Sequence, residues 1–207
     1  MIIKVCGITR QEDVESCLAL GVDWLGFIFH PSSPRCVSPE AAARLQTGKA
    51  KRVGVCVSQT LEEIEHLMDR ARLDLVQLHG DQPVETCRRL GPDRVIKVFW
   101  PERFVDKEGF EAELSRFEAA ASTFLFDAGR KGGGSGEPII AAWLGKLISP
   151  RPWLLAGGLG PETIRMLLGA CRPQGVDLNS GIEAAPGLKE HSKLKQTLEA
   201  IKGVHHA

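Results

Sequence analysis

The sequence lacks an excess of charge of either sign. Its 207 residues include 26 Lys and Arg and 26 Asp and Glu, so the formal net charge is zero. Proteins that bind nucleic acid or an anionic membrane through their overall field usually carry a basic excess. We therefore expect neither nucleic acid nor membrane as a partner, and an anionic ligand would have to be held by local groups.

Long hydrophobic runs and closely spaced cysteine pairs are also missing. No segment approaches the roughly 18 apolar residues of a membrane-spanning helix, and the first residues, MIIKVCGITR, are too short an apolar run for a signal peptide. The six cysteines are widely spread, without a CxxC pair. These absences predict a cytoplasmic protein with mostly buried, reduced thiols, and they give no indication of a metal site.

The sequence does contain a regular alternation of two kinds of segment. Nearly continuous apolar runs indicate strands that are covered on both faces. These runs are Ile2–Cys6, Trp24–Phe29, Arg52–Val57, Asp74–His79, Arg94–Phe99, Thr123–Asp127, Trp153–Ala156 and Gly175–Leu178. Between them lie segments with helical spacing of apolar residues. They are Gln11–Leu20, Pro39–Leu45, Leu61–Ala71, Pro83–Leu90, Phe110–Ala121, Ile139–Ile148, Glu162–Ala170 and His191–Ile201.

Eight strands that alternate with eight helices predict an α/β fold with a parallel sheet and helical crossovers. Eight such units in a chain of this length are typical of a (β/α)8 TIM barrel. We therefore expect one domain over residues 1–207, with eight parallel strands inside an outer ring of helices. The alternative is an open, doubly wound sheet, which usually has fewer units.

Polar residues gather where the predicted strands end, which is where barrels of this class place their active sites. Cys6, His79 and Asp127 stand at the ends of the first, fourth and sixth strands, and Arg35 follows the second. The opposite strand ends are poor in such groups. This asymmetry predicts an active site at the carboxyl ends of the strands.

Two glycine-containing loops predict a phosphate site. Gly157 and Gly158 follow the seventh strand, and Ser180 and Gly181 follow the eighth, where a short helix could begin. Glycine lets backbone N–H groups approach an anion closely, and the start of a helix favours negative charge. A third glycine run, residues 132–136, lacks the Lys-Ser/Thr of a nucleotide-binding loop. We expect a mobile lid there, with a plain connector as the alternative.

Six motifs, in order, resemble those of the phosphoribosylanthranilate isomerase family and cover residues 2 to about 195. They are KVCGIT at 4–9, GFIF at 26–29 with SPR at 33–35, VQLHG at 76–80, FD at 126–127 before GGSG, LAGGL at 155–159, and VDLNSGIE at 176–183. The chain departs from the family pattern at Cys36, where Tyr is usual, and at Asn179, where Ser is more typical.

The resemblance implies an isomerase of tryptophan biosynthesis that needs neither metal nor organic cofactor. Its reaction is the Amadori rearrangement of N-(5-phosphoribosyl)anthranilate, a phosphosugar, to 1-(o-carboxyphenylamino)-1-deoxyribulose 5-phosphate. In this numbering Cys6 is the expected general base, Asp127 the general acid, and Arg35 the partner of the anthranilate carboxylate. The base role calls for a thiol pKa below its usual value, and the acid role for a raised carboxyl pKa.

Several assignments stay open. His79 and Asp177 are candidate substrate contacts, but each could equally serve as a structural hydrogen-bonding group. Phe29 is a candidate contact for the anthranilate ring, with a place in the core as the alternative. The pair His205–His206 is expected to be part of a frayed tail rather than a metal site.

Two other functions compete with this interpretation. A related histidine-pathway aminoaldose isomerase also performs an Amadori rearrangement. That family resembles an enzyme with two catalytic aspartates, one of them at the end of the first strand, where this chain has Cys6. A phosphosugar-binding barrel without activity is the second alternative. No helix shows a wide exposed apolar stripe, so we expect a monomer, with a homodimer as the alternative.

Overall fold

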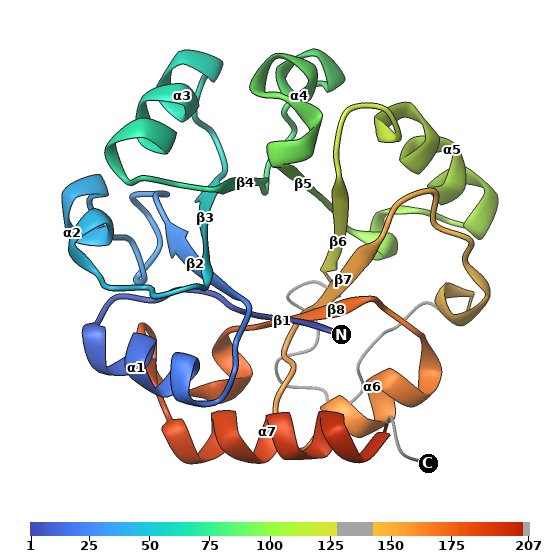
Figure 1. The fold of residues 1–207 in the computed structure, drawn as a ribbon. Coiled ribbons are helices and arrows are strands. Elements are labelled where there is room, and N and C mark those ends of the chain that lie inside the picture. Colours follow the sequence, from blue (N-terminus) through green and yellow to red (C-terminus); the bar gives the residue numbers. More distant parts are fainter. Residues whose placement is uncertain (128–142, 205–207) are drawn as a thin grey trace.

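The computed structural model describes residues 1–127 and 143–204. Eight parallel strands pair in chain order, and the last pairs with the first, so the sheet closes into a barrel (Figure 1). The expected (β/α)8 barrel is confirmed. The strands are β1 (Ile2–Val5), β2 (Trp24–Ile28), β3 (Lys51–Cys56), β4 (Leu75–Leu78), β5 (Val95–Phe99), β6 (Thr123–Asp127), β7 (Trp153–Ala156) and β8 (Gly175–Leu178).

The helices of the described residues surround the barrel (Figure 1). They are α1 (Gln11–Ala19), α2 (Pro39–Arg44), α3 (Leu61–Arg70), α4 (Val84–Leu90), α5 (Lys107–Phe117), α6 (Ile164–Ala170) and α7 (His191–Val204). Short 3-10 helices are η1 (Pro92–Arg94), η2 (Pro101–Arg103), η4 (Leu144–Lys146) and η5 (Ser180–Ile182). None of the helices in the described part of the chain is long and apolar enough to cross a bilayer.

Two predicted helices differ from the structure. The helix α5 begins three residues earlier than expected, because the Asp106 carboxylate accepts a hydrogen bond of 2.9 Å from the Gly109 N–H and caps the first turn. The helix expected over Ile139–Ile148 is wrong in its described part, where the structure has only the 3-10 helix η4 followed by extended backbone. The glycine run at 132–136 and the pair His205–His206 lie outside the described residues.

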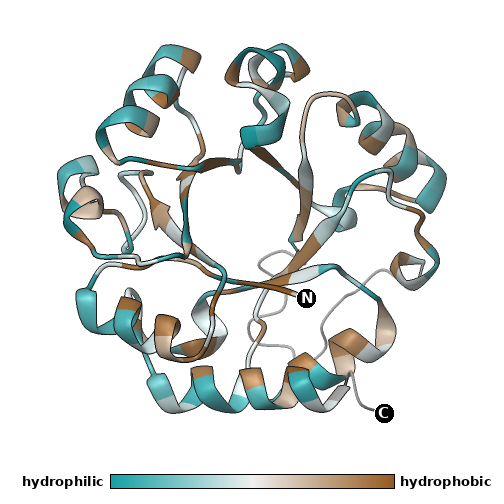
Figure 2. Ribbon diagram, in the orientation of Figure 1, coloured by the Kyte–Doolittle hydropathy of each residue, from teal (hydrophilic) through white to brown (hydrophobic). Residues whose placement is uncertain are grey.

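Side chains alternate between the inside of the barrel and the space under the helices, as successive residues of a strand must. The inner apolar cluster is formed by Trp24, Val53, Leu75, Ile96, Val98, Leu125, Leu154 and Ala156. A larger cluster lies between the strands and the helices. Figure 2 shows this as hydrophobic strands inside a ring of helices whose hydrophilic residues lie mainly on the outside. Burial on both faces explains why the strand segments are almost continuously apolar.

A short hairpin follows β8 and was not predicted. The short helix expected after Asn179 is present as the 3-10 helix η5, and the strands β9 (Glu183–Ala185) and β10 (Leu188–Lys189) come next as an antiparallel pair. Gly187 has a φ of +80° between the two strands, a backbone conformation that glycine adopts without strain. The hairpin therefore brings Glu183 and Lys189 together beside the end of the barrel.

Candidate active site

A cavity of about 850 Å³ opens at the carboxyl ends of the barrel strands. Its walls are formed by residues at the carboxyl ends of the barrel strands and in the segments that follow them, with Cys6 directly after β1. The predicted site residues among its lining are Cys6, Arg35, His79, Asp127, Gly157, Gly158, Asp177 and Ser180. The fold thus brings together groups that are up to 174 positions apart in the sequence.

The floor of the cavity is formed by Cys6 and a buried ion pair. Cys6 is 4% exposed and packs with Ile28 and Val55. Two positions earlier on the same strand, Lys4 is fully buried, and its Nζ lies 2.8 Å from both carboxylate oxygens of Asp177. Asp177 is directly opposite Lys4 in the register of β1 and β8. The hydrogen-bonding role left open for Asp177 is therefore present, with Lys4 as its partner.

The pKa of the Cys6 thiol shifts in the direction opposite to that expected. Burial raises the pKa of Cys6 above its usual value, and the nearby charges of Lys4 and Lys189 only partly oppose this effect, while Asp177 adds to it. A thiolate in a largely dehydrated place loses solvation that the sequence alone does not reveal. The expected lowered thiol pKa is wrong for this geometry.

His79 and Asp127 lie side by side in the wall of the same cavity. The His79 Nε2 and Asp127 Oδ2 atoms are 3.5 Å apart, and the His79 Nδ1 is 3.2 Å from the Nε2 of Gln77. Burial lowers the pKa of His79 to about 4, so its imidazole is neutral near pH 7. Gln77 fixes one ring nitrogen, which leaves the other directed at Asp127. His79 therefore has both a structural partner and a place in the cavity wall.

Arg35 is positioned by a carboxylate that the sequence analysis did not single out. Its Nε lies 2.9 and 3.1 Å from the two oxygens of Glu183, and its Nη2 lies 2.5 Å from one of them. Lys189 also contacts Glu183, at 2.8 Å. The loop that carries Arg35 is tied to the end of β2, because the Val37 N–H donates to the Ile28 carbonyl at 3.0 Å. The guanidinium is thus held at the rim along one edge.

The close approach of Arg35 to the end of β1 requires glycine at position 7. Gly7 has a φ of +72°, and a Cβ atom there would lie 2.7 Å from Cδ of Arg35 and 2.9 Å from Oδ1 of Asn179. Side chains rarely adopt this backbone conformation, and no room exists for one. Gly7 therefore allows Arg35 to lie across the mouth of the barrel.

The two glycine loops expected to bind phosphate lie against each other. Gly157 and Gly158 both have positive φ, of 104° and 66°. A Cβ atom on Gly181 would lie 2.1 Å from the carbonyl oxygen of Leu159, so the loop after β8 packs directly on the loop after β7. Gly181 itself is not among the cavity-lining residues, whereas Gly157, Gly158 and Ser180 are. Its part is to join the two loops closely.

The aromatic side chain that lines the cavity was left open by the sequence. Phe29 is buried in the cluster between strands and helices and does not line the cavity, so of its two possible roles the place in the core is the one observed. Trp100 lines the cavity instead, at a ring-centre distance of 5.4 Å from His79. The guanidinium of Arg103 lies over the Trp100 ring at 3.9 Å. Both residues follow β5, and the sequence analysis found no polar motif at the end of that strand.

Sequence reasoning also missed the buried polar groups of the site. Lys4 and Gln77 lie within apolar strand segments, and Glu183 lies beyond the last barrel strand. A charged or amide residue inside such a run is the one signal that could have indicated them, because burial of a polar group requires a partner. Nothing in the local sequence, however, identifies Asp177 as the partner of Lys4.

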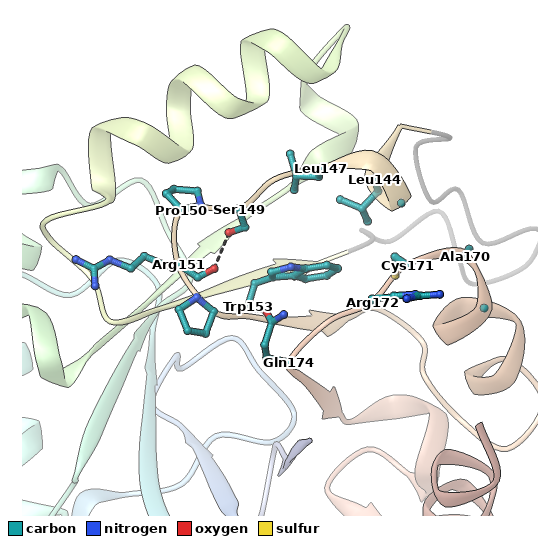
Figure 3. Close-up of a pocket in the computed structure, with 13 residues that line it drawn as sticks. Leu144, Leu147, Ser149, Pro150, Arg151, Trp153, Ala170, Cys171, Arg172 and Gln174 are labelled. Atoms are coloured by element: carbon teal, nitrogen blue, oxygen red, sulfur yellow. Dashed lines mark hydrogen bonds between the residues drawn. The ribbon is translucent and has the colours of Figure 1, made fainter. Parts of the chain in front are cut away.

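A second cavity, of about 600 Å³, lies at the opposite end of the barrel, beside the residues that precede β7 and β8 (Figure 3). Trp153 and Gln174 line it, and the Arg151 side chain points away from the Trp153 ring. The Arg151 Nε donates to the Glu118 carbonyl at 2.6 Å. The lining of this second cavity includes no Asp, Glu or His side chain among the described residues.

Within residues 1–127 and 143–204, no group of three or more His, Cys, Asp or Glu side chains is arranged to hold a metal ion. The expectation of a cofactor-free reaction stays a prediction. The chemistry that the site offers is proton transfer, because a thiol and a carboxyl group face one cavity with cationic groups around them.

Comparison with known proteins identifies the family. A family model described as N-(5'phosphoribosyl)anthranilate (PRA) isomerase matches residues 3–200. A protein of Desulfovibrio desulfuricans named N-(5'-phosphoribosyl)anthranilate isomerase is 50% identical over 198 residues, 96% of this chain and 94% of that protein. The chain belongs to the phosphoribosylanthranilate isomerase family. It is accordingly an isomerase of tryptophan biosynthesis.

Solved structures of phosphoribosylanthranilate isomerases share the fold. The enzyme from Thermus thermophilus is 38% identical, with a TM-score of 0.82 and coverage of 99% of this chain and 100% of that one. A second structure, in complex with reduced 1-(o-carboxyphenylamino)-1-deoxyribulose 5-phosphate, is 34% identical, with a TM-score of 0.80 and coverage of 98% and 100%. The histidine-pathway alternative is therefore not the family to which the chain belongs.

Proposed function

We propose that the chain converts N-(5-phosphoribosyl)anthranilate to 1-(o-carboxyphenylamino)-1-deoxyribulose 5-phosphate, with Cys6 as general base and Asp127 as general acid. The observation that carries the proposal is the placement of these two groups, Cys6 directly after β1 and Asp127 at the end of β6, on one cavity at the carboxyl ends of the strands. The conversion itself is that of the family. The roles of Cys6 and Asp127 in this chain are what we propose here.

Ring opening is the step assigned to Asp127. A protonated Asp127 donates its proton to the furanose ring oxygen, the bond between that oxygen and C1 breaks, and the anilino nitrogen forms a double bond to C1. The neutral imidazole of His79 stands next to the carboxyl group, at 3.5 Å. It contributes a dipole rather than a full positive charge beside the carboxyl group.

Proton abstraction is the step assigned to Cys6. The thiolate removes the proton from C2 of the Schiff base, and the C2 electrons form the enaminol that becomes the ketose. A thiol with a raised pKa is less often ionised, but its thiolate is a stronger base. The cations Lys4, Lys189 and Arg35 lie close enough to Cys6 to interact with its charge.

Recognition of the anthranilate carboxylate is assigned to Arg35. Glu183 binds the edge of the guanidinium that carries Nε. The outer edge, formed by the two terminal nitrogens, is the edge that we assign to the planar carboxylate of the substrate. Trp100 is the aromatic ring of the same cavity among the described residues and offers a surface for the anthranilate ring.

Arg35→Ala should weaken substrate binding. Truncation of one partner of a desolvated charge pair costs about 2–5 kcal/mol, so we expect KM to rise by about thirtyfold or more. The matched control is Arg44→Ala, which removes an exposed arginine on α2 and should leave KM within about twofold. Steady-state kinetics give the KM of both variants for comparison with the wild type. A folded Arg35→Ala enzyme with wild-type KM would show that the carboxylate is bound elsewhere.

The phosphate group is assigned to the loops after β7 and β8. The Gly158 N–H has no hydrogen-bond acceptor among the described residues, and the first N–H groups of η5 are free of intrahelical partners by their position. We expect a crystal grown with phosphate to show the anion surrounded by the backbone N–H groups of Gly158, Ser180 and Gly181. An anion bound at residues 132–136 instead, with these loops empty, would contradict the assignment.

Turnover tests the proposed function directly. Phosphoribosylanthranilate is fluorescent, and its fluorescence should decay when the purified protein is added, with formation of the aminoketose confirmed by mass spectrometry after borohydride reduction. A phosphosugar-binding barrel without activity would bind the substrate without this decay. That result would overturn the proposal.

A further inference from the structure

Lys4 is the feature of the barrel interior that the proposed roles leave unexplained. Its side chain is fully buried, and its ammonium group is locked by Asp177 through two contacts of 2.8 Å. Replacement of a buried ion pair by apolar residues of similar volume is often neutral or stabilising. Stability alone therefore does not account for a lysine and an aspartate in the middle of this barrel.

The geometry directs Lys4 toward Cys6 as well as toward Asp177. Cys6 follows β1 directly and continues its pairing with β8, because its N–H donates to the Leu178 carbonyl at 2.8 Å, so side chains two positions apart leave the backbone on the same face. Gly26, on the neighbouring strand β2, leaves the space between them open. A Cβ atom on Gly26 would lie 2.8 Å from the Cys6 sulfur and 3.1 Å from the Lys4 nitrogen. Sulfur and ammonium thus border the same small space.

Four charged groups face Cys6 from the elements packed against it. Lys4 on β1, Lys189 on β10 and Arg35 in the loop after β2 are cationic, and Asp177 on β8 is anionic. Lys4 has the strongest influence of the four on the pKa of the thiol, because its positive charge favours the thiolate. Its own pKa is raised, because Asp177 and Cys6 overcome the effect of burial, so it stays an ammonium.

We propose that Lys4 is the positioning residue of Cys6: its ammonium group, held by Asp177, is the counter-ion of the thiolate that removes the C2 proton. This inference rests on the proposed role of Cys6. In the step the sulfur gains the proton and loses its negative charge, while Lys4 keeps its own proton throughout. Asp177 prevents the lysine from turning away toward solvent and also limits how strongly it attracts the thiolate.

The test measures the ionisation of Cys6 directly. Iodoacetamide alkylation of the peptide that contains Cys6 is followed by mass spectrometry from pH 6 to pH 10, in a Cys36→Ser background that removes the exposed thiol. The variants are Lys4→Met, Asp177→Asn and the two combined. The combined variant leaves no unpaired buried charge, so it provides the answer where Lys4→Met alone does not fold. Lys97→Met is the control, because Lys97 is also buried but contacts the Gly80 carbonyl.

Removal of Lys4 and removal of Asp177 should shift the pH dependence of Cys6 alkylation in opposite directions. Loss of an opposite charge within a few ångströms moves a titration by about one pH unit or more. Lys4→Met should therefore lower the alkylation rate at pH 8 by about tenfold or more, both alone and in the Asp177→Asn background. Asp177→Asn alone should raise the rate, and Lys97→Met should leave it unchanged. Unaltered Cys6 alkylation after removal of Lys4, in folded protein of either background, overturns the proposal.

Kinetics separate this inference from the proposed function. If both hold, Lys4→Met lowers kcat by about tenfold or more near neutral pH with KM nearly unchanged, and the loss becomes smaller as the pH rises. If alkylation shifts as expected but kcat does not fall, Lys4 controls the thiol and the fault lies with the catalytic role of Cys6. A purely structural lysine would lower stability without moving the alkylation profile.

Discussion

Cys6→Ser should lower kcat by about 10² to 10⁴-fold, the contribution typical of a positioned base. Serine keeps the shape of the side chain, but its hydroxyl is far too weakly acidic to supply an anion at neutral pH. The C2 proton then remains in place, whereas ring opening by Asp127 still occurs. Serine and cysteine are similar in size, so the exchange changes the packing of this side chain against Ile28 and Val55 only slightly.

Fluorescence decay and borohydride trapping together check this prediction. The open Schiff base should accumulate on Cys6→Ser and be captured by borohydride as a reduced amine. Cys36→Ser is the matched control, since Cys36 is an exposed cysteine, and it should retain activity within about twofold. A Cys6→Ser enzyme that works within a few-fold of the wild-type rate would refute the base assignment.

Asp127→Asn should abolish turnover to a similar extent but at an earlier step. The amide keeps the size of the side chain and can still hydrogen-bond with His79, yet it has no proton to give to the ring oxygen. The substrate therefore stays closed, and we expect kcat to fall by about 10² to 10⁴-fold. Binding should change far less, because the contacts assigned to Arg35 and to the glycine loops remain.

The trapping experiment distinguishes the two variants. With Asp127→Asn, borohydride should capture no open-chain amine, in contrast to Cys6→Ser. Asp69→Asn, which alters an exposed aspartate on α3, serves as the control and should behave as wild type. Capture of the reduced amine on Asp127→Asn in wild-type amounts would assign ring opening to another acid, and His79 would be the next candidate because it adjoins the same carboxylate.

Most of the barrel could be predicted because its strands are buried on both faces. A strand such as Trp24–Ile28, which is buried at every residue, consists of a continuous run of apolar residues. The first polar residues then indicate where the strand ends. The site followed from the same rule, since Cys6, His79 and Asp127 stand at such ends. The hairpin of β9 and β10 escaped prediction because strands of three and two residues have no recognisable period.

The polar interior could not be predicted for a different reason. Whether Lys4 faces the barrel axis or the helices depends on the tilt and closure of the whole sheet, and its partner Asp177 lies 173 positions away. The pKa of the Cys6 thiol was predicted wrongly for the same reason. The expected base role called for a lowered thiol pKa, but the effect of dehydration on Cys6 depends on how completely its neighbours enclose it.

The pairing of β1 with β8 also governs when the enzyme can begin to work. A ribosome makes Lys4 and Cys6 first, whereas Asp177, Ser180 and Glu183 are among the later residues to be added. A sheet of β1 to β7 without β8 would have two unpaired edges, and such edges are prone to join other chains. A nascent chain thus acquires its activity in a single late event, when one strand closes the ring and completes the cavity wall.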